Sequence, residues 1–403
     1  MTRLRELGEW CGGNTPSKAN AAYWTDGTIP WVSPKDMKVD EISSSEDRIS
    51  DQALADGRVS MVPAGSVLFV TRSGILAHTL PVAVTKLPVT INQDLKALSP
   101  RPEVLPKYVA HAMRGASQRV LKQCSKHGTT VASVDTNALL DFEVPMARLD
   151  VQQRIVAEIE TQFSRLDQAV TNLQRAKANL RRYVSGVLTE AVSGTLTASS
   201  KTDWQAVTVA DVGDVLLGRR RAPEYATSAH LRSYLRVANI KDDFIAFDDL
   251  ESMRFDDRHL ARYQLAPGDI LVSEGQSPEK LGQSAIFRGY PQPLCFQSTL
   301  HRFRANPALT SPEFAQIVFR SHVRSGVFRK LGSITTNIGH LTLEKFKVAP
   351  FPLPPLAEQQ QIVAEVERRL SIALGVETQV EANLKRAQSL RQAVLDKAFA
   401  VEA

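Results

Sequence analysis

The sequence predicts an α+β protein of two globular domains, each followed by a long helix. We expect the two helices to pair as an antiparallel coiled coil with pseudo-twofold symmetry. The first observation is a repeat: QQRIVAEIE (Gln152–Glu160) recurs as QQQIVAEVE (Gln359–Glu367), with seven identities in nine positions at an offset of 207 residues. Each copy begins a stretch of roughly 40 residues with apolar positions three and four apart, which would make a helix of about 60 Å. Each stretch follows a segment of mixed strand and helix patterns, so the chain contains an internal duplication of a globular segment and a long helix.

The predicted domain limits are 1–148 and 204–351 for the globular domains and 149–196 and 352–403 for the helical spacers. A chain of 403 residues is too long for one ordinary core. No apolar run of about 18 residues occurs, and the start MTRLRELGEW has no apolar signal-peptide core, so we expect no membrane span and a cytoplasmic protein. Three widely spaced cysteines argue against a disulfide framework and suit a reducing compartment.

The first globular domain shows short strand patterns between turns. The predicted strands are Val67–Thr71, Val82–Val84, Val89–Asn92, Leu95–Leu98 and a last one at Asp141–Pro145. Thr28–Met37 is an extended apolar stretch interrupted by proline. Pro106–Arg114 starts with proline and predicts a helix, since proline suits a first helical turn.

The second globular domain repeats this order. Tyr234–Ile240 takes the place of Thr28–Met37, and Pro312–Arg320 is a second proline-started helix. Phe346–Val348 matches Phe142–Val144, which would place a strand there. The expected sheets are twisted and largely antiparallel.

The two spacers carry narrow apolar stripes. The stripe positions are Ile155, Ile159, Phe163, Leu166, Val170, Leu173, Leu180, Val184, Val187 and Ala191, and then Val366, Leu370, Ala373, Val380, Leu384, Ala387, Val394 and Ala398. A stripe this long and narrow is typical of a coiled-coil seam. The alternative is that each helix packs only on its own domain, but the duplication favours a pair.

No catalytic motif is present. The chain has no Gly-x-x-x-x-Gly-Lys phosphate loop, no Gly-x-Gly-x-x-Gly after a strand, no Gly-x-Ser-x-Gly elbow and no Asn-Pro-Pro-Tyr-like motif. Cys124 and His127 lack a second ligand pair nearby, so a loop is a better interpretation than a metal site. We therefore expect no catalysis, no metal and no cofactor bound by this chain.

Binding is the remaining function, and a net charge of +6 suits nucleic acid. Basic and amide side chains that could contact phosphates or base edges lie in the predicted loops. The candidates are Lys35, Arg72, Gln93, Lys96, Arg219, Arg220, Arg221, Arg236, Asn239, Lys241, Gln297 and Arg302. Arg219–Arg221 is the first choice for phosphate contact. The alternative for each residue is a solvated surface charge.

Two different readers held apart by a rigid rod would meet two different half-sites on one face of DNA. The predicted target is therefore an asymmetric, bipartite sequence of double-stranded DNA with an unread gap.

The whole chain resembles the specificity subunit of type I restriction–modification systems. LPPLAEQQQIVAEVE (Leu353–Glu367) is similar to that family's signature at the start of a helical region, and VPMARLDVQQRIVAEIE is a looser copy. GNTPSKANAAYWTDGTIPWVSPKDM (Gly13–Met37) resembles the opening of the family's target-recognition domains. The first copy departs from the signature, because Met146-Ala147-Arg148 stands where Leu353-Pro354-Pro355 stands.

The resemblance implies a non-catalytic subunit that joins two modification subunits and two restriction subunits. The modification subunits would methylate adenine N6 with S-adenosylmethionine, and the restriction subunits would use ATP and Mg²⁺ for translocation and cleavage. Two alternatives stay open: a coiled-coil adaptor whose globular domains bind protein, and a fragment of a fused enzyme. An adjacent reading frame for a separate adenine methyltransferase would exclude the fused enzyme.

Overall fold

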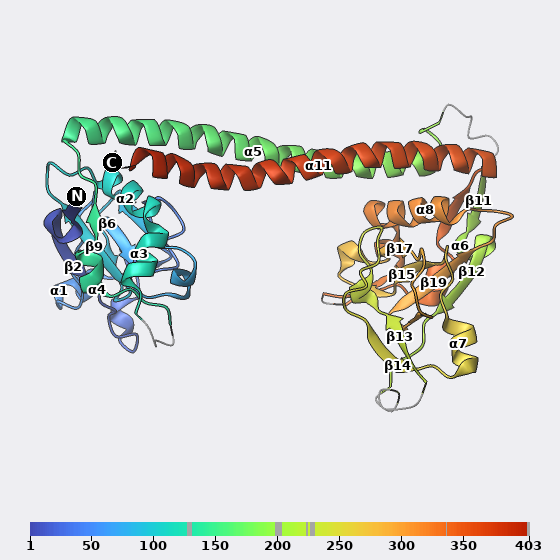
Figure 1. Ribbon diagram of the computed structural model, residues 1–403. Coiled ribbons are helices and arrows are strands. Elements are labelled where there is room, and N and C mark those ends of the chain that lie inside the picture. Colours follow the sequence, from blue (N-terminus) through green and yellow to red (C-terminus); the bar gives the residue numbers. More distant parts are fainter. Residues whose placement is uncertain (127–130, 198–203, 223–224, 226–229, 336, 401–403) are drawn as a thin grey trace. The chain divides into compact units, whose positions relative to one another are not determined.

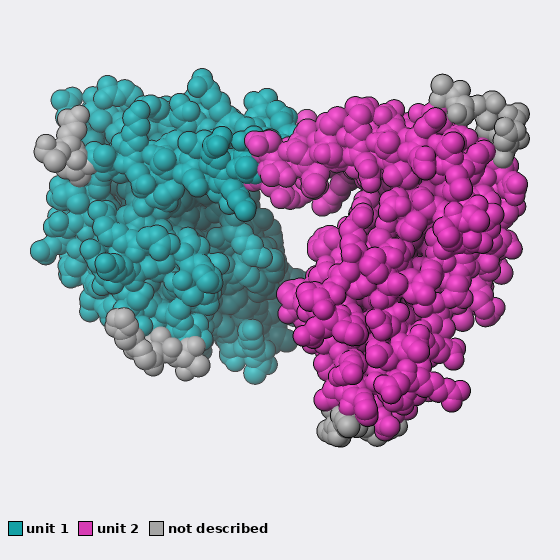
Figure 2. Space-filling model, turned by 45° about the vertical axis from the view of Figure 1, so that its right-hand side comes forward, with its two compact units in different colours: residues 1–173, 382–403 teal, residues 174–381 magenta. Residues whose placement is uncertain are grey.

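The chain forms two compact units. The computed structural model describes residues 1–126, 131–197, 204–222, 225, 230–335 and 337–400. One unit comprises Met1–Leu173 with Ala382–Ala403, and the other comprises Gln174–Glu381 (Figures 1 and 2). Each unit contains one globular part and a portion of each of two long helices. The division thus falls inside the long helices, whereas the predicted domain limits separate the helices from the globular parts.

The first globular part is built around a five-stranded sheet in the order β2-β9-β6-β7-β4. Its strands are β2 (Gly8–Gly12), β9 (Leu95–Pro100), β6 (Val67–Val70), β7 (Val82–Thr85) and β4 (Glu41–Ile42). All its pairs are antiparallel except β4 with β7. A second sheet contains β5 (Asp47–Ile49), β3 (Ile29–Val32) and β8 (Thr90–Ile91), with β3 parallel to β8.

Short helices and one strand pair complete this part. The strand pair is β1 (Thr2–Arg3) with β10 (Glu143–Val144). The α-helices are α1 (Asp51–Ala55), α2 (Pro106–Gly115), α3 (Ser117–Cys124) and α4 (Thr136–Leu140), with 3-10 turns at Leu4–Glu6, Ala21–Tyr23 and Gly74–Ala77. The predicted strands and the predicted proline-started helix are confirmed.

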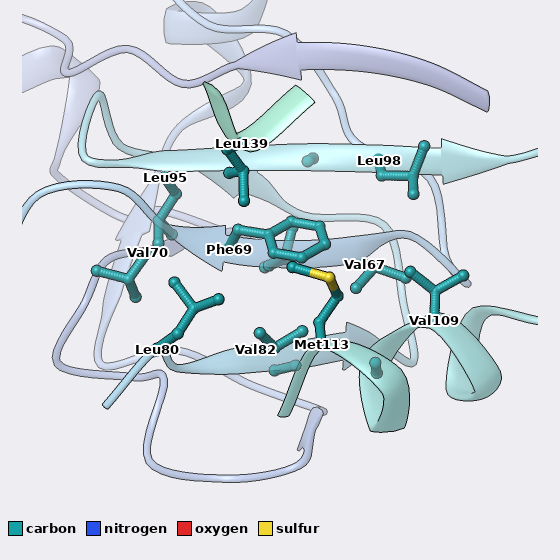
Figure 3. Packing of buried hydrophobic residues seen from close by; sticks show 14 of the residues in the cluster. Val67, Phe69, Val70, Leu80, Val82, Leu95, Leu98, Val109, Met113 and Leu139 are labelled. Atoms are coloured by element: carbon teal, nitrogen blue, oxygen red, sulfur yellow. The ribbon is translucent and has the colours of Figure 1, made fainter. Parts of the chain in front are cut away.

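The core of the first unit lies between the large sheet and α2. In Figure 3, Met113 of α2 points towards Phe69 of β6, with Leu139 of α4 close by. All four residues of β6 are buried, which explains its unbroken run of apolar residues. Each such side chain contributes about 1.5–3 kcal/mol when fully buried.

The second globular part repeats this topology. Its large sheet, β12-β19-β15-β17, contains β12 (Gly213–Leu217), β19 (Leu300–Ala305), β15 (Ile270–Ser273) and β17 (Ser284–Ile286), all antiparallel. A second sheet contains β14 (Glu251–Arg254), β13 (Leu231–Leu235) and β18 (Cys295–Phe296), with β13 parallel to β18. A third contains β16 (Gly275–Gln276), β21 (Gly339–His340) and β20 (Ser333–Ile334).

The helices of the second globular part occur in an order similar to that of the first part. They are α6 (Val209–Val212), α7 (Asp257–Tyr263), α8 (Pro312–Ser325), α9 (Val327–Leu331) and α10 (Leu343–Lys347), with 3-10 turns at Val237–Asn239 and Pro278–Lys280. The proline-started α8 is confirmed, and its N-cap is Ser311, whose hydroxyl accepts a hydrogen bond from the Phe314 N–H. The core of the second globular part is rich in phenylalanine and includes Phe319 and Phe346, whose ring centroids lie 5.3 Å apart.

The strand expected at Phe346–Val348 is wrong. Phe346 lies inside α10, and the strand is β22 (Pro350–Leu353), which pairs with β11 (Gln205–Thr208) as β10 pairs with β1. Phe142 and Phe346 are both buried core residues, but the chain between each of them and its strand differs in length, so the match of the two phenylalanines does not place the strand.

Two long helices, α5 (Leu149–Ser193) and α11 (Leu356–Ala398), pair in antiparallel fashion within each unit (Figure 1). In the second unit, Lys177 contacts Glu381 at 2.7 Å and Glu190 contacts Arg369 at 3.2 Å, so residue numbers rise along one helix and fall along the other.

The helix pairing in the first unit is similar. Arg391 bonds Asp167 at 2.9 Å, and Leu395 packs with Ile159 and Phe163. The predicted stripe residues that are fully buried are Ile159, Phe163, Val187, Ala191, Val366, Ala373, Val380 and Ala387. Val187, Ala191 and Val366 of this set also pack in the core of the second globular part. The antiparallel contacts between α5 and α11 confirm the coiled-coil interpretation. No helix in the described part of the chain has the length and apolar character of a membrane span.

Candidate nucleic-acid interface

The carboxyl ends of one parallel strand pair organise a polar edge in each unit. Two parallel strands end at the same side of a sheet, so the residues that follow them converge. In the first unit these strands are β3 and β8, and in the second they are β13 and β18. The residues that follow them include half of the predicted binding residues, namely Lys35, Gln93, Arg236, Asn239, Lys241 and Gln297.

Main-chain hydrogen bonds draw further segments to this edge in the first unit. They are Asn92 N–H to Val32 O at 2.9 Å, Asn14 N–H to Ile91 O at 3.0 Å, Thr71 N–H to Asp94 O at 2.8 Å and Val134 N–H to Thr71 O at 2.8 Å. We call residues 13–15, 33–36, 71–72, 92–94 and 131–134 the convergent edge of the first unit.

The second unit makes the equivalent bonds. They are Gln297 N–H to Leu235 O at 2.9 Å, Arg219 N–H to Phe296 O at 3.1 Å, Glu274 N–H to Thr299 O at 2.9 Å and Leu341 N–H to Glu274 O at 2.7 Å. Its convergent edge comprises residues 218–219, 236–239, 274–276, 297–299 and 339–341. The two edges thus share one main-chain framework.

A glycine is required at each edge because two chain segments touch there. A Cβ atom on Gly13 would lie 2.0 Å from the carbonyl oxygen of Asn92, and one on Gly218 would lie 2.1 Å from that of Gln297. The close approach brings Thr15 to Gln93, and the two side chains are hydrogen bonded.

The four predicted residues of the first unit lie at or beside its convergent edge. Gln93 is exposed, and Lys96 is half-buried with its ammonium over Gly12. Arg72 bonds Asp94 at 2.6 Å.

Lys35 of the same edge bonds Asp47 at 2.9 Å and Glu46 at 3.0 Å. Hydrogen bonds to Asp47 and Glu46 raise the pKa of Lys35 above its ordinary value. These pairs are partly exposed, and such pairs contribute little to stability, so a phosphate could replace the carboxylates.

The structure separates the three arginines that were predicted to act together. Arg219 is 8% exposed, and its guanidinium lies 4.4 Å from the Tyr225 ring centroid and 5.2 Å from that of Phe255. Arg220 and Arg221 are exposed, and Arg221 contacts Glu251 at 3.3 Å. Arg219 therefore holds its loop in place, and a phosphate contact remains a prediction for the other two.

Asn239 and Arg302 also have internal partners, contrary to their expected exposure. Asn239 is 2% exposed; its carbonyl accepts from the Arg236 N–H at 2.9 Å and its amide donates to Asp249 O at 2.8 Å. Arg302 is 6% exposed, lies within β19 and pairs with Asp214. Both side chains are therefore bound within the framework, and a DNA contact by either of them stays a prediction.

The remaining predicted residues of the second unit stay accessible. Arg236 bonds Asp249 at 2.5 Å and Glu251 at 3.1 Å. Lys241 is exposed and donates to Ala238 O at 2.7 Å, and Gln297 is half-buried in the turn after β18. Glu251 also accepts from Tyr234, and burial together with this hydrogen bond raises the pKa of Tyr234 to about 12.

Two groups at this side of the units were missed by sequence reasoning. A hollow of about 510 Å³ beside the first edge is lined by Asn14, Thr15, Pro16, Ser17, Asn20, Tyr23 and Arg58. Arg58 belongs to no recognisable sequence motif, and only the folded chain places it beside residues 14–23. In the second unit, Ile334 and Ile338 are 48% and 51% exposed beside the strands β20 and β21.

The cysteines do not form a site in the described residues. Cys124 is buried, and burial raises the pKa of its thiol, while His127 lies outside the described residues. No cluster of His, Cys, Asp or Glu suited to a metal ion occurs among the residues that the structure describes.

A duplicated polar edge, carried by two similar globular parts that share a helix pair, defines a class of two-site binding proteins. The family model for the type I restriction modification DNA specificity domain matches residues 1–178 and 201–386. The chain belongs to this family.

Individual proteins similar to this chain are specificity subunits of type I restriction enzymes. The chain is 40% identical over 179 residues to the EcoR124I/EcoR124II type I restriction enzyme specificity subunit of Escherichia coli, which covers 44% of each protein. It is 26% identical over 312 residues to the StySPI specificity subunit of Salmonella potsdam, covering 75% of this chain and 66% of that one. The chain thus spans less than two thirds of the length of these relatives.

Solved structures share the fold. A chain from work on assembly and conformational transition of the type I R-M system superposes with a TM-score of 0.77 at 18% identity, covering 100% of this chain and 97% of that chain. The HsdS subunit from Thermoanaerobacter tengcongensis gives a TM-score of 0.57 at 19% identity, covering 100% and 96%.

Proposed function

We propose that this chain is the non-catalytic DNA-reading subunit of a type I restriction–modification complex. Each globular part binds one half of an asymmetric, bipartite target in double-stranded DNA through its convergent edge. The observation that carries the proposal is that one main-chain framework occurs twice with different side chains. Ser33 and Asp36 occupy the turn of the first edge where Arg236 and Asn239 occupy that of the second. Different side chains on one framework read different bases.

The chemistry of the edges suits double-stranded DNA. Lysine and arginine side chains lie beside amides, as expected for contacts to phosphates and to the base edges of the major groove. Because most of the cations at the edges already bond carboxylates, DNA must compete for them, which favours binding only where base contacts add to phosphate contacts.

The catalytic partners follow from the family and are part of the proposal. Two modification subunits with S-adenosylmethionine methylate adenine N6, and restriction subunits with ATP and Mg²⁺ act on unmodified DNA, in the cytoplasm where the chromosome lies. The long helices are their scaffold. Ile372 and Val376 of α11 lie one turn apart on the same side of the helix and are 56% and 43% exposed, which offers an apolar surface to a partner helix.

The test is a methylation map. The chain is produced with the modification subunit from its own gene neighbourhood in a host without other adenine methylation, and modified adenines are mapped by single-molecule sequencing. We expect one motif of two unequal halves separated by unspecified bases. A continuous motif would refute the two-reader proposal. The adaptor alternative predicts that methylation, if any, does not depend on this chain.

A further inference from the structure

Two buried glutamines occupy matching places, one at the start of each long helix. Gln152 is 1% exposed and Gln359 is 0% exposed, and both are the first glutamine of the repeated segment. The next residues, Gln153 and Gln360, are exposed. A buried amide must have its hydrogen-bonding groups satisfied, so its partners show what it holds.

Gln152 joins the first globular part to α5. Its side-chain carbonyl accepts from the Leu105 N–H at 2.8 Å, and its amide donates to Glu103 O at 3.0 Å and to Ala147 O at 2.8 Å. Leu105 directly precedes α2, and Ala147 belongs to the segment leading into α5. One side chain therefore ties the start of α2 to the start of the long helix.

Gln359 repeats this arrangement in the second unit. Its carbonyl accepts from the Ser311 N–H and the Thr310 hydroxyl, both at 3.1 Å, and its amide donates to Leu309 O at 2.8 Å and to Pro354 O at 2.9 Å. Ser311 directly precedes α8, as Leu105 precedes α2. The same three main-chain groups are bound in both units. Because most of the partners are main-chain atoms, the arrangement does not depend on the side chains of the recognition part.

The other end of each proline-started helix contacts the other long helix. In the first unit, Gln392 of α11 donates to Gly115 O at 2.9 Å, and a Cβ on Gly115 would lie 3.2 Å from Leu395. In the second unit, Arg324 of α8 lies 3.5 Å from the Ser185 hydroxyl of α5. Each globular part thus contacts the long helices of its own unit at two places.

We propose that Gln152 and Gln359 are positioning residues that make DNA reading selective for one gap length. The inference rests on the proposed function. One added base pair moves the second half-site by about 3.4 Å and rotates it by about 34°. A recognition part that is locked on its helix cannot follow this change, whereas one released from its glutamine can tilt towards the displaced half-site.

The experiment measures methylation of duplexes that carry both half-sites with the native gap or with one base pair removed or added. The full complex is prepared with Gln152→Met and with Gln359→Met, which keep the side-chain size and remove the hydrogen bonds. The matched controls are Gln153→Met and Gln360→Met. The readout is the rate on an altered gap divided by the rate on the native gap, which is independent of the folded fraction.

We expect this ratio to rise about tenfold in each buried variant, a loss of about 1.4 kcal/mol of discrimination, and to stay at the wild-type value in the controls. Thr310→Val removes one bond from Gln359 and should raise the ratio less, without the folding cost of the glutamine variants. Wild-type ratios in all three buried-site variants would overturn the proposal while leaving the bipartite motif intact. Failure of the proposed function shows differently, as no bipartite motif in the wild type.

Discussion

Asp36 and Asn239 hold equivalent turns through one hydrogen bond of the same direction and a second of opposite direction. Asp36 accepts from the Ser33 N–H and the Glu46 N–H, both at 2.8 Å. Asn239 also accepts at the first position but donates to Asp249 O at the second. The amide nitrogen of Asn239, which replaces a carboxylate oxygen of Asp36, reverses the second hydrogen bond, and the turn is kept. Side chains of the edge can therefore vary without loss of the main-chain framework.

The separation of the arginines gives a prediction at this scale. Changing Arg220 and Arg221 together to alanine should weaken binding to all DNA sequences and lower the slope of log K against log salt by about 2, since each phosphate contact contributes about 0.9. The slope is measured by fluorescence titration of the complex at several salt concentrations. Arg175→Ala, on an exposed part of α5, is the control.

Arg219→Ala should behave differently. It removes a guanidinium packed on Tyr225 and Phe255, so we expect a loss of about 1–2 kcal/mol in stability with little change in the salt slope. A slope change as large as that of the double variant would place Arg219 among the phosphate contacts instead.

The sequence could predict which residue types are suited to contact DNA, but not which of them are bound to other side chains or main-chain groups within the protein. Arg302 and Asn239 were reasonable candidates by residue type. Their burial depends on Asp214, 88 residues earlier in the chain, and on the loop that ends at Asp249. Gln152 and Gln359 did leave a signal, because both belong to the identical part of the repeat. Nothing local distinguished them from the exposed glutamines beside them.

At the scale of elements, the helices were predictable because their signals are local. Pro106 and Pro312 begin α2 and α8 where a first helical turn tolerates proline, and the apolar stripes of α5 and α11 extend over many turns. The short strand β22 could not be placed from the sequence, since the position of a two- to four-residue strand depends on the strand with which it pairs.

The helix pair should depend on its apolar seam more than on its ion pairs. Phe163 is buried against Leu395 and His111, so Phe163→Ala should cost about 3 kcal/mol. Asp167→Asn removes the exposed bond to Arg391 and should cost under about 1 kcal/mol. Urea denaturation measures both, with the exposed Gln168→Ala as control. Equal losses for the two variants would mean that charge pairing holds the helices.

At the scale of the whole molecule, the duplication explains why the chain is organised as it is. One architecture, encoded twice, gives two units that contain equivalent sheets, equivalent proline-started helices and equivalent glutamines. The edges that differ in side chains are the parts that can diverge, because the framework beneath them is made of main-chain bonds. The central claim is that the two edges read DNA independently.

The most direct measurement exchanges residues 204–350 for the corresponding part of another family member and maps the methylated motif again. The predicted result is a motif in which one half changes while the other half and the gap length stay the same. The gap should persist because Gln359 stays in place and its main-chain partners are supplied by any recognition part with this fold. A motif in which both halves change, or neither does, would contradict the account.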